Sequence, residues 1–367
     1  MALGGVFRVE IRPLPRCGHR EHQSRSPIMR VLSLLSLLAL EISAACINAE
    51  AVTKPPAGAV VVDLNSKDAG VYKTIQDAVA SLPNDSSSRT IFVYPGKYRG
   101  QVILRRPGAT TFQGYTEDTT NQGANTVTLS NSLVASVAGS NAKSATLQIY
   151  ASDTKVYNMN FENNYGNGGG PGSQAQALAL SQSGERNGYY AVGFYSYQDT
   201  VFTADGTSYF GNNYIQGAVD YIFGRKGTAY FYNSILANSN RGFITAQGRE
   251  SDSYSAAFVF DKAKLITVVN GTDNKMYLGR PWGNHSTVLF KNSDFGNVLD
   301  ARGWTAWSTT DPRTDAVYYA EYNNMGASAW GSSRASFAKQ IGKDEAEGRW
   351  SVKGTLGSDS WIDSRFR

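Results

Sequence analysis

Short apolar bursts, separated by Gly, Asn, Ser and Asp, follow one another along the chain from about position 60 onward. Because they are rich in Val, Ile, Phe, Tyr and Thr, they predict short β-strands. Clear examples cover 90–94, 145–150, 156–161, 189–194, 230–235 and 287–290. A helical period is clear only in 72–82, where Ile75, Ala78, Val79 and Leu82 share one face. Strands without intervening helices argue against a doubly wound α/β fold.

A loose repeat accompanies the bursts, in which an Asn is followed three residues later by an apolar residue. It occurs at Asn158/Phe161, Asn212/Ile215, Asn233/Leu236 and Asn292/Phe295. The step of 21 residues from Asn212 to Asn233 fits one coil of a parallel β-solenoid with short turns. Turn asparagines would then stack as a hydrogen-bonded ladder, and the helix at 72–82 would cover one open end. A β-sandwich fits the strand bursts nearly as well.

The N-terminal segment resembles a targeting signal. Residues 31–40 are the only strongly apolar run, with Arg30 before them and small residues after them up to Ala51. This is the secretory pattern, and the run is too short to span a bilayer comfortably. We therefore expect a non-native or mis-annotated extension at 1–28, a signal peptide at 29–51 and a single domain at 52–367. The expected location is extracellular.

Two further sequence features do not identify a function. Sequons begin at Asn84, Asn270 and Asn284, which is compatible with glycosylation. The Gly-rich run at 166–172 lacks the Gly-Lys-Ser/Thr ending of a phosphate-binding loop, so it predicts a flexible connection.

Composition excludes much familiar chemistry. The chain has 367 residues with only 2 Cys and 3 His, and after position 50 only His285 remains of these types. A thiolate nucleophile, a Cys-based zinc site and a disulfide framework are therefore excluded from the expected domain. His285 lies in an expected exposed turn and is a poor candidate for a catalytic base. The net charge of +5 is mild, and no basic-aromatic pattern or basic amphipathic helix indicates a nucleic acid or a membrane surface.

Two acids lie among apolar and aromatic neighbours. Asp199 is in the run YQDTVF at 197–202, and Asp220 is in GAVDYIFG at 217–224. They are 21 residues apart, so a solenoid would place them on adjacent coils. A buried Asp needs a cation partner if it is ionised, or else its pKa is raised. Arg280 could be that partner for one of the two acids, through a bidentate pair of hydrogen bonds. Two carboxylates in different environments can act as nucleophile and acid.

Amides and an aromatic ring complete this group. Gln176 precedes Gln198 by 22 residues, so two amide donors on adjacent coils could form an oxyanion hole. Trp282 offers a flat face of the kind that stacks on sugar rings. The alternative is structural: a Gln ladder and an Arg–Asp brace inside a solenoid. Spacing alone does not separate the two interpretations.

The same segments resemble the signature blocks of the pectin methylesterases (pectinesterases), most closely in their microbial, fungal-like branch. The blocks are QALAL at 176–180, YQDT at 197–200, IQGAVDYIFG at 215–224, LGRPW at 278–282 and GWTAW at 303–307. They occur in the family's order, and the resemblance covers about 58–365. It implies a right-handed parallel β-helix and hydrolysis of the methyl esters of pectin, with no metal and no cofactor. The partner would be pectin, with neither nucleic acid nor membrane, and the chain would be a monomer.

The resemblance also implies roles for individual residues. Asp220 would be the nucleophile, Asp199 the general acid and then base, and Arg280 the residue that orients Asp220. Gln176 and Gln198 would stabilise the oxyanion, while Phe202, Phe223 and Trp282 would line the sugar-binding cleft. One departure is Gly100, where the family often has Glu; we expect it to affect structure or the substrate edge rather than the chemistry.

Two other functions remain to be weighed. A polygalacturonase or lyase on a related solenoid would cut the pectin chain instead of removing its esters. The polygalacturonase is a glycosidase, and glycosidases need carboxylates at set separations. A non-catalytic pectin-binding relative would have lost site residues. The intact blocks favour the esterase over both.

Overall fold

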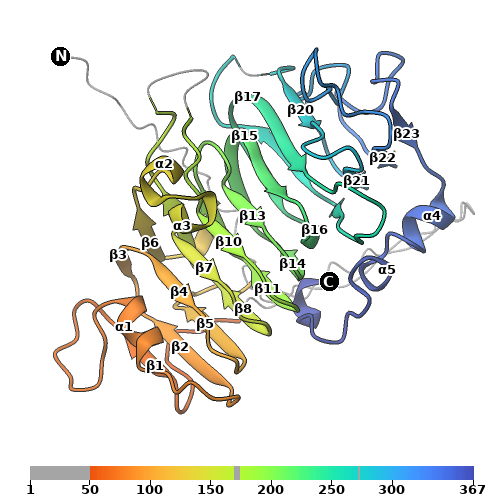
Figure 1. Cartoon of the computed structure of the whole chain (residues 1–367). Helices are drawn as coiled ribbons and strands as arrows, with labels where there is room; N and C mark the ends of the chain where they lie inside the picture. The colour runs from red at the N-terminus through yellow and green to blue at the C-terminus, as the bar shows by residue number, and fades with distance from the viewer. Residues whose placement is uncertain (1–49, 169–173, 272) are drawn as a thin grey trace, which may run out of the picture. The chain divides into compact units, whose positions relative to one another are not determined.

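Parallel strands stack coil upon coil around three faces in the part of the chain that the structure describes (Figure 1). This computed structural model describes residues 50–168, 174–271 and 273–367, which lie in the compact unit Asn48–Arg367. The expected extension at 1–28 and all but the last two residues of the expected signal peptide lie outside the described residues. So does 169–173, most of the expected glycine-rich connection.

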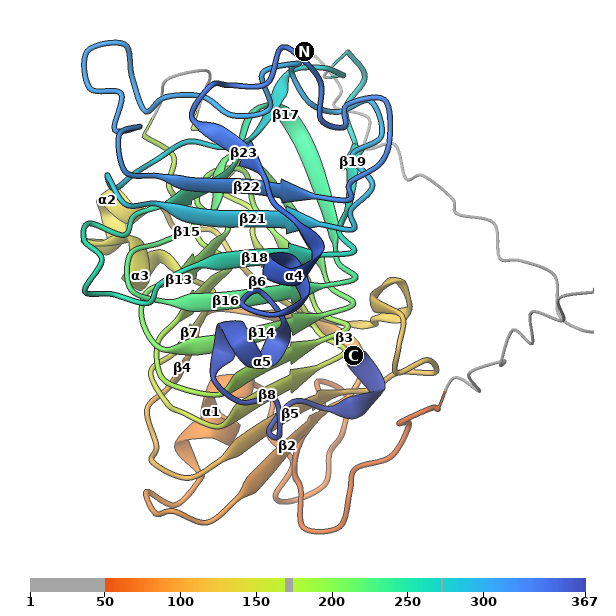
Figure 2. The ribbon, with the colours of Figure 1, turned by 90° about the vertical axis from the view of Figure 1, so that its right-hand side faces the viewer.

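The first face is an 11-stranded sheet in which every strand pairs in parallel with the next. Figure 2 shows this face turned toward the viewer, with its strands running across the view one above another. In order, its strands are β1 (Val60–Val62), β2 (Arg89–Val93), β5 (Thr110–Gly114), β8 (Thr154–Tyr157), β11 (Asn187–Tyr190), β14 (Thr207–Gly211), β16 (Thr228–Tyr232), β18 (Phe258–Asp261), β21 (Thr287–Lys291), β22 (Tyr318–Tyr322) and β23 (Ala338–Gln340).

The second and third faces are joined through two long strands, β15 (Tyr214–Gly224) and β17 (Ile235–Gln247), which bend across the corner between them. The second face also holds β3 (Gly96–Arg99), β6 (Val127–Asn131), β9 (Asn160–Asn163), β12 (Gly193–Tyr195) and β19 (Lys264–Thr267). The third holds β4 (Val102–Leu104), β7 (Leu147–Ile149), β10 (Leu180–Gln182), β13 (Val201–Thr203) and β20 (Met276–Gly279).

The coil length matches the spacing seen in the sequence. Thr207 pairs with Thr228 on the first face and Val201 with Ile222 on the third, each a step of 21 residues. The fold is therefore the expected parallel β-helix, and the β-sandwich alternative is wrong. The asparagines at the corner between the first and second faces also behave as expected, because the Asn233 side-chain amide donates to the Asn212 Oδ1 at 2.9 Å.

Asn recurs at this corner because the backbone there is left-handed. Asn158, Asn212, Asn233 and Asn292 have φ of 52°, 56°, 47° and 52°, a region that Asn tolerates better than other non-Gly residues. The apolar residue three positions later is fully buried in each case.

Three of the expected strands are in fact two strands joined by such a corner. The bursts at 156–161, 189–194 and 230–235 turn at Asn158, Ala191 and Asn233, all with positive φ. The apolar pattern could not reveal these bends, since buried side chains continue on both sides of a corner only one or two residues long.

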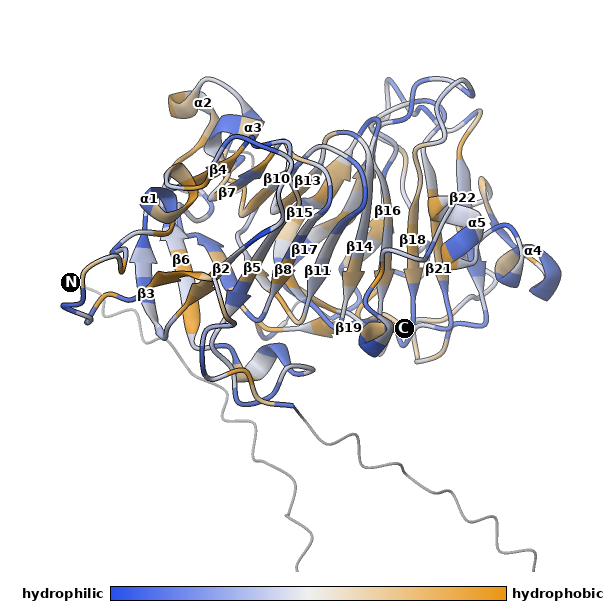
Figure 3. Ribbon diagram, turned by 90° about the horizontal axis from the view of Figure 1, so that it is seen from below, coloured by the Kyte–Doolittle hydropathy of each residue, from blue (hydrophilic) through white to orange (hydrophobic). Residues whose placement is uncertain are grey.

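The core on the first face is a stack of aromatic rings. Tyr189, Phe210, Phe231, Phe260 and Phe290 follow one another at centroid distances of 4.7, 4.5, 4.5 and 4.2 Å. Parallel strands in register place identical positions directly above one another, so one ring per coil suffices to build the column. Figure 3 shows hydrophobic and polar positions interspersed along these strands.

One helix was expected and it is present. The helix α1 (Ile75–Ala80) begins after Thr74, whose side chain accepts a hydrogen bond from the Asp77 N–H, and it buries Ile75 and Ala78 at the N-terminal end of the solenoid. Six other short helical segments were missed because each is less than two turns long and shows no period. They are η1 (Gln122–Ala124), α2 (Ala135–Ala138), α3 (Asn141–Ser144), α4 (Lys343–Glu347), α5 (Val352–Leu356) and η2 (Ser364–Phe366). None of the helices in the described ranges is long and apolar enough to cross a membrane.

Gly100 has a structural explanation. Its φ of 111° lies in the region that favours glycine, and a Cβ there would meet no atom within 4 Å. The backbone conformation, rather than a lack of room, therefore favours glycine at this position.

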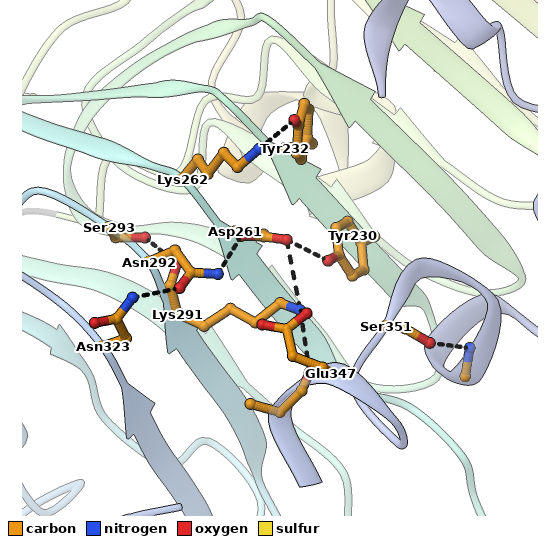
Figure 4. A network of polar contacts seen from close by, with 12 residues as sticks. Tyr230, Tyr232, Asp261, Lys262, Lys291, Asn292, Ser293, Asn323, Glu347 and Ser351 are labelled. Carbon is orange, nitrogen blue, oxygen red and sulfur yellow. Dashed lines mark hydrogen bonds and ion pairs between the residues drawn. The ribbon is translucent and has the colours of Figure 1, made fainter. Parts of the chain in front are cut away.

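The C-terminal segment packs across the outside of the first face, with α4 and α5 in front of it in Figure 2. It covers a second set of aromatic rings, including Tyr190 and Tyr209, with Phe366 among its own residues. Figure 4 shows the polar contact that fastens it: Lys291 is almost fully buried and lies 3.5 Å from Asp261 and 3.6 Å from Glu347. The Lys291 ammonium also donates to the Ala346 carbonyl at 3.0 Å, so it ties α4 to β21.

Candidate active site

A polar cleft of about 260 Å³ lies beside the corner between the second and third faces. Its two acids and its amides come from consecutive coils, and its aromatic rings come from the strands and connections next to them. The lining residues are Asn141, Gln174, Gln176, Gln198, Asp199, Asp220, Phe223, Ala246, Arg280, Trp282 and Trp307.

Asp199 and Asp220 occupy equivalent positions on adjacent coils, as the spacing predicted. The Asp199 N–H donates to the Val219 carbonyl at 3.1 Å, and Gln198 bridges in parallel to Val219. Both acids are 6% exposed and left-handed, with φ of 64° and 49°. The register of β15 against β17 shifts on both sides of Val219, so the strand is irregular where it presents Asp220.

Arg280 holds Asp220 through two hydrogen bonds. Its Nε donates to Oδ1 at 2.9 Å and its Nη2 to Oδ2 at 2.6 Å. The guanidinium lies between two aromatic rings, 4.0 Å from the centroid of Phe243 and 4.4 Å from that of Trp307. This packing fixes the plane of the guanidinium, and the bidentate contact then fixes the Asp220 carboxylate.

The two acids therefore differ in their electrostatics. Burial raises the pKa of Asp199 well above its ordinary value, and the charge of Asp220 raises it further, with Arg280 opposing both. Burial also raises the pKa of Asp220, but its hydrogen bonds and charge interaction with Arg280 offset part of that rise. Asp220 thus ionises first, and Asp199 keeps its proton to higher pH.

The two glutamines are neighbours in the cleft, joined by a parallel bridge between their backbones. The Gln198 Oε1 accepts from the Ala175 N–H at 3.3 Å, which leaves the Gln198 NH₂ group to donate elsewhere. The Gln176 NH₂ donates one bond to the Gln174 Oε1 at 2.8 Å and retains a second hydrogen. Both can therefore donate to an oxyanion.

The three expected aromatic residues form one cluster, but only two of them line the cleft. Phe223 and Trp282 do so, whereas Phe202 stacks on Phe223 one coil away, with centroids 4.5 Å apart. The Trp282 ring carries the Arg225 guanidinium 4.0 Å from its centroid, so that face is not open for a sugar.

Sequence reasoning missed four residues of the cleft, one of which, Ala246, is a small apolar residue on β17. Trp307 belongs to a recognised block but received no role, and Gln174 lies just before another block. Asn141 gave no signal, because it lies on α3, far from the acids in sequence. Its Nδ2 nevertheless donates to the Asp199 Oδ2 at 2.9 Å.

His285 is not in the cleft lining. It is half-buried, with its Nδ1 3.2 Å from the Asp252 Oδ1. Among the described residues, no group of three or more His, Cys, Asp or Glu gathers in a way that could hold a metal ion.

Fold and site together present two buried carboxylates on adjacent coils of a parallel β-helix, one of them held by an arginine. The family model described as pectinesterase matches residues 59–359, and the chain therefore belongs to the pectinesterase, or pectin methylesterase, family of ester hydrolases. A pectinesterase of Aspergillus aculeatus is 36% identical over 344 residues, which cover 90% of this chain and 99% of that protein.

Solved structures agree with this assignment. The pectin methylesterase of Aspergillus niger has a TM-score of 0.77 and 33% identity, and the match covers 86% of this chain and 100% of that chain. A pectin methylesterase from carrot has a TM-score of 0.75 and 25% identity, covering 85% of this chain and 97% of that one.

Proposed function

We propose that this pectin methylesterase hydrolyses the methyl esters of galacturonate units in pectin through Asp220 and Asp199. The observation that carries the proposal is the unequal pair: two buried acids on adjacent coils, of which only Asp220 is held by Arg280. One acid is thereby ionised and fixed in direction while the other retains a proton.

In the first half of the reaction, an Asp220 oxygen attacks the ester carbonyl carbon. The carbonyl oxygen becomes an oxyanion that accepts hydrogen bonds from the amides of Gln198 and Gln176. The C–O bond to the methoxy group then breaks while Asp199 gives its proton to the departing oxygen, so methanol leaves. A mixed anhydride between Asp220 and the galacturonate carboxyl group remains.

In the second half, the Asp199 carboxylate accepts a proton from water. The resulting hydroxide attacks the galacturonate carbonyl carbon, the anhydride bond to Asp220 breaks, and the free galacturonic acid carboxyl group loses its proton to solvent as it is released. Asp199 is again protonated and Asp220 ionised, so the net reaction consumes one water per ester. Proton transfer by a positioned side chain contributes roughly 10²–10⁴-fold to such a reaction.

The test measures methanol release from highly methylated pectin by the 52–367 chain, with viscosity followed in the same tube. Methanol without a fall in viscosity is the expected result, and Asp220→Asn should remove it while the protein stays folded. A fall in viscosity without methanol would mean that the enzyme cleaves the polysaccharide backbone. Methanol release by Asp220→Asn near the wild-type rate would refute the assigned nucleophile.

We also propose that the enzyme is exported and acts on plant cell wall pectin. The apolar run at 31–40 with small residues after it supports export, and Asn84, Asn270 and Asn284 are all exposed, as glycan acceptors need to be. Expression of the full chain in a secreting host should yield protein in the medium whose first residue lies near 52. Retention in the cell with residues 31–40 intact would refute this.

A further inference from the structure

Asn141 makes a contact with one of the two acids that the mechanism above does not use. Its Nδ2 lies 2.9 Å from the Asp199 Oδ2, and among the described residues no other side chain donates a hydrogen bond to that carboxyl group. We propose that Asn141 is a positioning residue that fixes the Asp199 carboxyl group and assigns its proton to Oδ1. This inference rests on the proposed role of Asp199 as acid and base.

The argument follows from what each atom can do. An amide NH₂ group only donates, so the oxygen that faces it must accept. In the protonated acid, the oxygen that accepts is the carbonyl oxygen, and the proton must then be on the other one. The Asn141 contact at Oδ2 therefore leaves Oδ1 to carry the proton that methanol receives. Without it, the buried carboxyl group could rotate and present either oxygen.

The position of Asn141 supports a specific contact rather than an accidental one. It is the first residue of α3, and Ser140 before it caps the helix by accepting from the Lys143 N–H. The Ser144 hydroxyl donates to the Asn141 carbonyl at 2.7 Å, and Ser144 is fully buried. The backbone of Asn141 is thus held independently of its side chain.

We also expect the contact to affect the titration of Asp199. The charged groups that face this acid are Asp220 on β15 and Arg280 just after β20, while Lys143 on α3 is exposed. A donor to a carboxylate favours the ionised form, so Asn141 opposes the rise that burial and Asp220 cause. Removing it should raise the pKa of Asp199 further.

The experiment compares Asn141→Ala and the isosteric Asn141→Asp with the wild-type enzyme by methanol release across a pH series. For Asn141→Ala we expect kcat to fall about 10-fold with KM little changed, and the alkaline limb of kcat/KM to move up by about one pH unit. Asn141→Asp should have a larger effect, since it replaces the donor by a third carboxylate of the same size. Lys143→Ala, on the same helix, is the control and should leave kcat and the limb unchanged.

A double variant separates this inference from the proposed function. If Asn141 acts through Asp199, adding Asn141→Ala to Asp199→Asn should not lower the residual rate further. An unshifted alkaline limb in Asn141→Ala would overturn the inference. A rise in KM with kcat unchanged would also overturn it and would make Asn141 a substrate contact. If Asp199→Asn itself keeps the wild-type rate, the proposed function fails whatever Asn141 does.

Discussion

Asp199 and Asp220 repeat the same backbone position on consecutive coils, yet only Asp220 receives a guanidinium. A solenoid normally repeats an environment along with a position, as the aromatic column of the first face shows. Here Arg280, from just after β20, reaches one acid through two hydrogen bonds. This asymmetry favours the ionised form of Asp220 over that of Asp199.

The pH dependence should follow from that asymmetry. The proposed mechanism needs Asp220 ionised and Asp199 protonated. The value of kcat/KM should therefore rise with pH as Asp220 ionises and fall as Asp199 ionises, with apparent pKa values that belong to the pair. Arg280→Lys keeps a cation but loses the bidentate contact that lowers the pKa of Asp220. The acidic limb should therefore move to higher pH, with kcat/KM at the optimum lower by roughly 10–100-fold. An unchanged acidic limb would mean that Arg280 does not control the ionisation of Asp220.

The oxyanion role of Gln198 predicts an effect on kcat rather than on binding. Because Gln198 is anchored through its oxygen and donates through its NH₂ group, Gln198→Ala should lower kcat by about 10²–10³-fold with little change in KM. Gln216→Ala is the matched control, since Gln216 lies on the second face and does not line the cleft. An equal loss in both variants would point to general disruption of the coil.

The buried acid should also reduce stability in a pH-dependent way. Because the pKa of Asp199 is raised in the folded protein, the folded state binds a proton that the unfolded state releases above about pH 4. Stability is therefore lost as pH rises from there through the folded pKa. Asp199→Asn removes this loss, so its Tm should exceed that of the wild type by a few degrees at pH 7 and match it near pH 3.5. A Tm difference that does not change with pH would contradict this origin.

The sequence was most informative where the solenoid repeats. The spacing of Asn212 and Asn233 equals the coil length, and the same spacing separates Asp199 from Asp220, so their proximity could be predicted from the repeat alone. The corner at Ala191 stayed hidden, because it lacks the Asn of the repeat and burial continues through it.

Contacts between distant segments gave no sequence signal. Asn141 reaches Asp199 from a four-residue helix with no period, and nothing in its own neighbourhood marks it as part of the cleft. Trp282 lines the cleft, but the presence of Arg225 on its ring depends on a packing contact that no local pattern encodes.

The buried lysine in Figure 4 offers a test of how the C-terminal segment is attached. Lys291→Met leaves the Asp261 carboxylate buried without its cation, although Tyr230 and Asn292 still donate to it at 2.8 and 3.0 Å. Breaking a buried pair in this way costs about 3–5 kcal/mol, so the free energy of unfolding in urea should fall by that amount. Lys262→Met is the matched control: this neighbouring lysine is exposed and should contribute less than about 1 kcal/mol.

Adding Asp261→Asn to Lys291→Met should restore most of the lost stability, because the uncompensated charge is then gone while an acceptor oxygen remains for Tyr230. If the double variant stays as unstable as Lys291→Met alone, the loss must come instead from the hydrogen bond between Lys291 and the Ala346 carbonyl, and α4 would be held by that bond rather than by the ion pair. Methanol release per folded molecule should not change in any of these variants, since none of the altered residues lines the cleft.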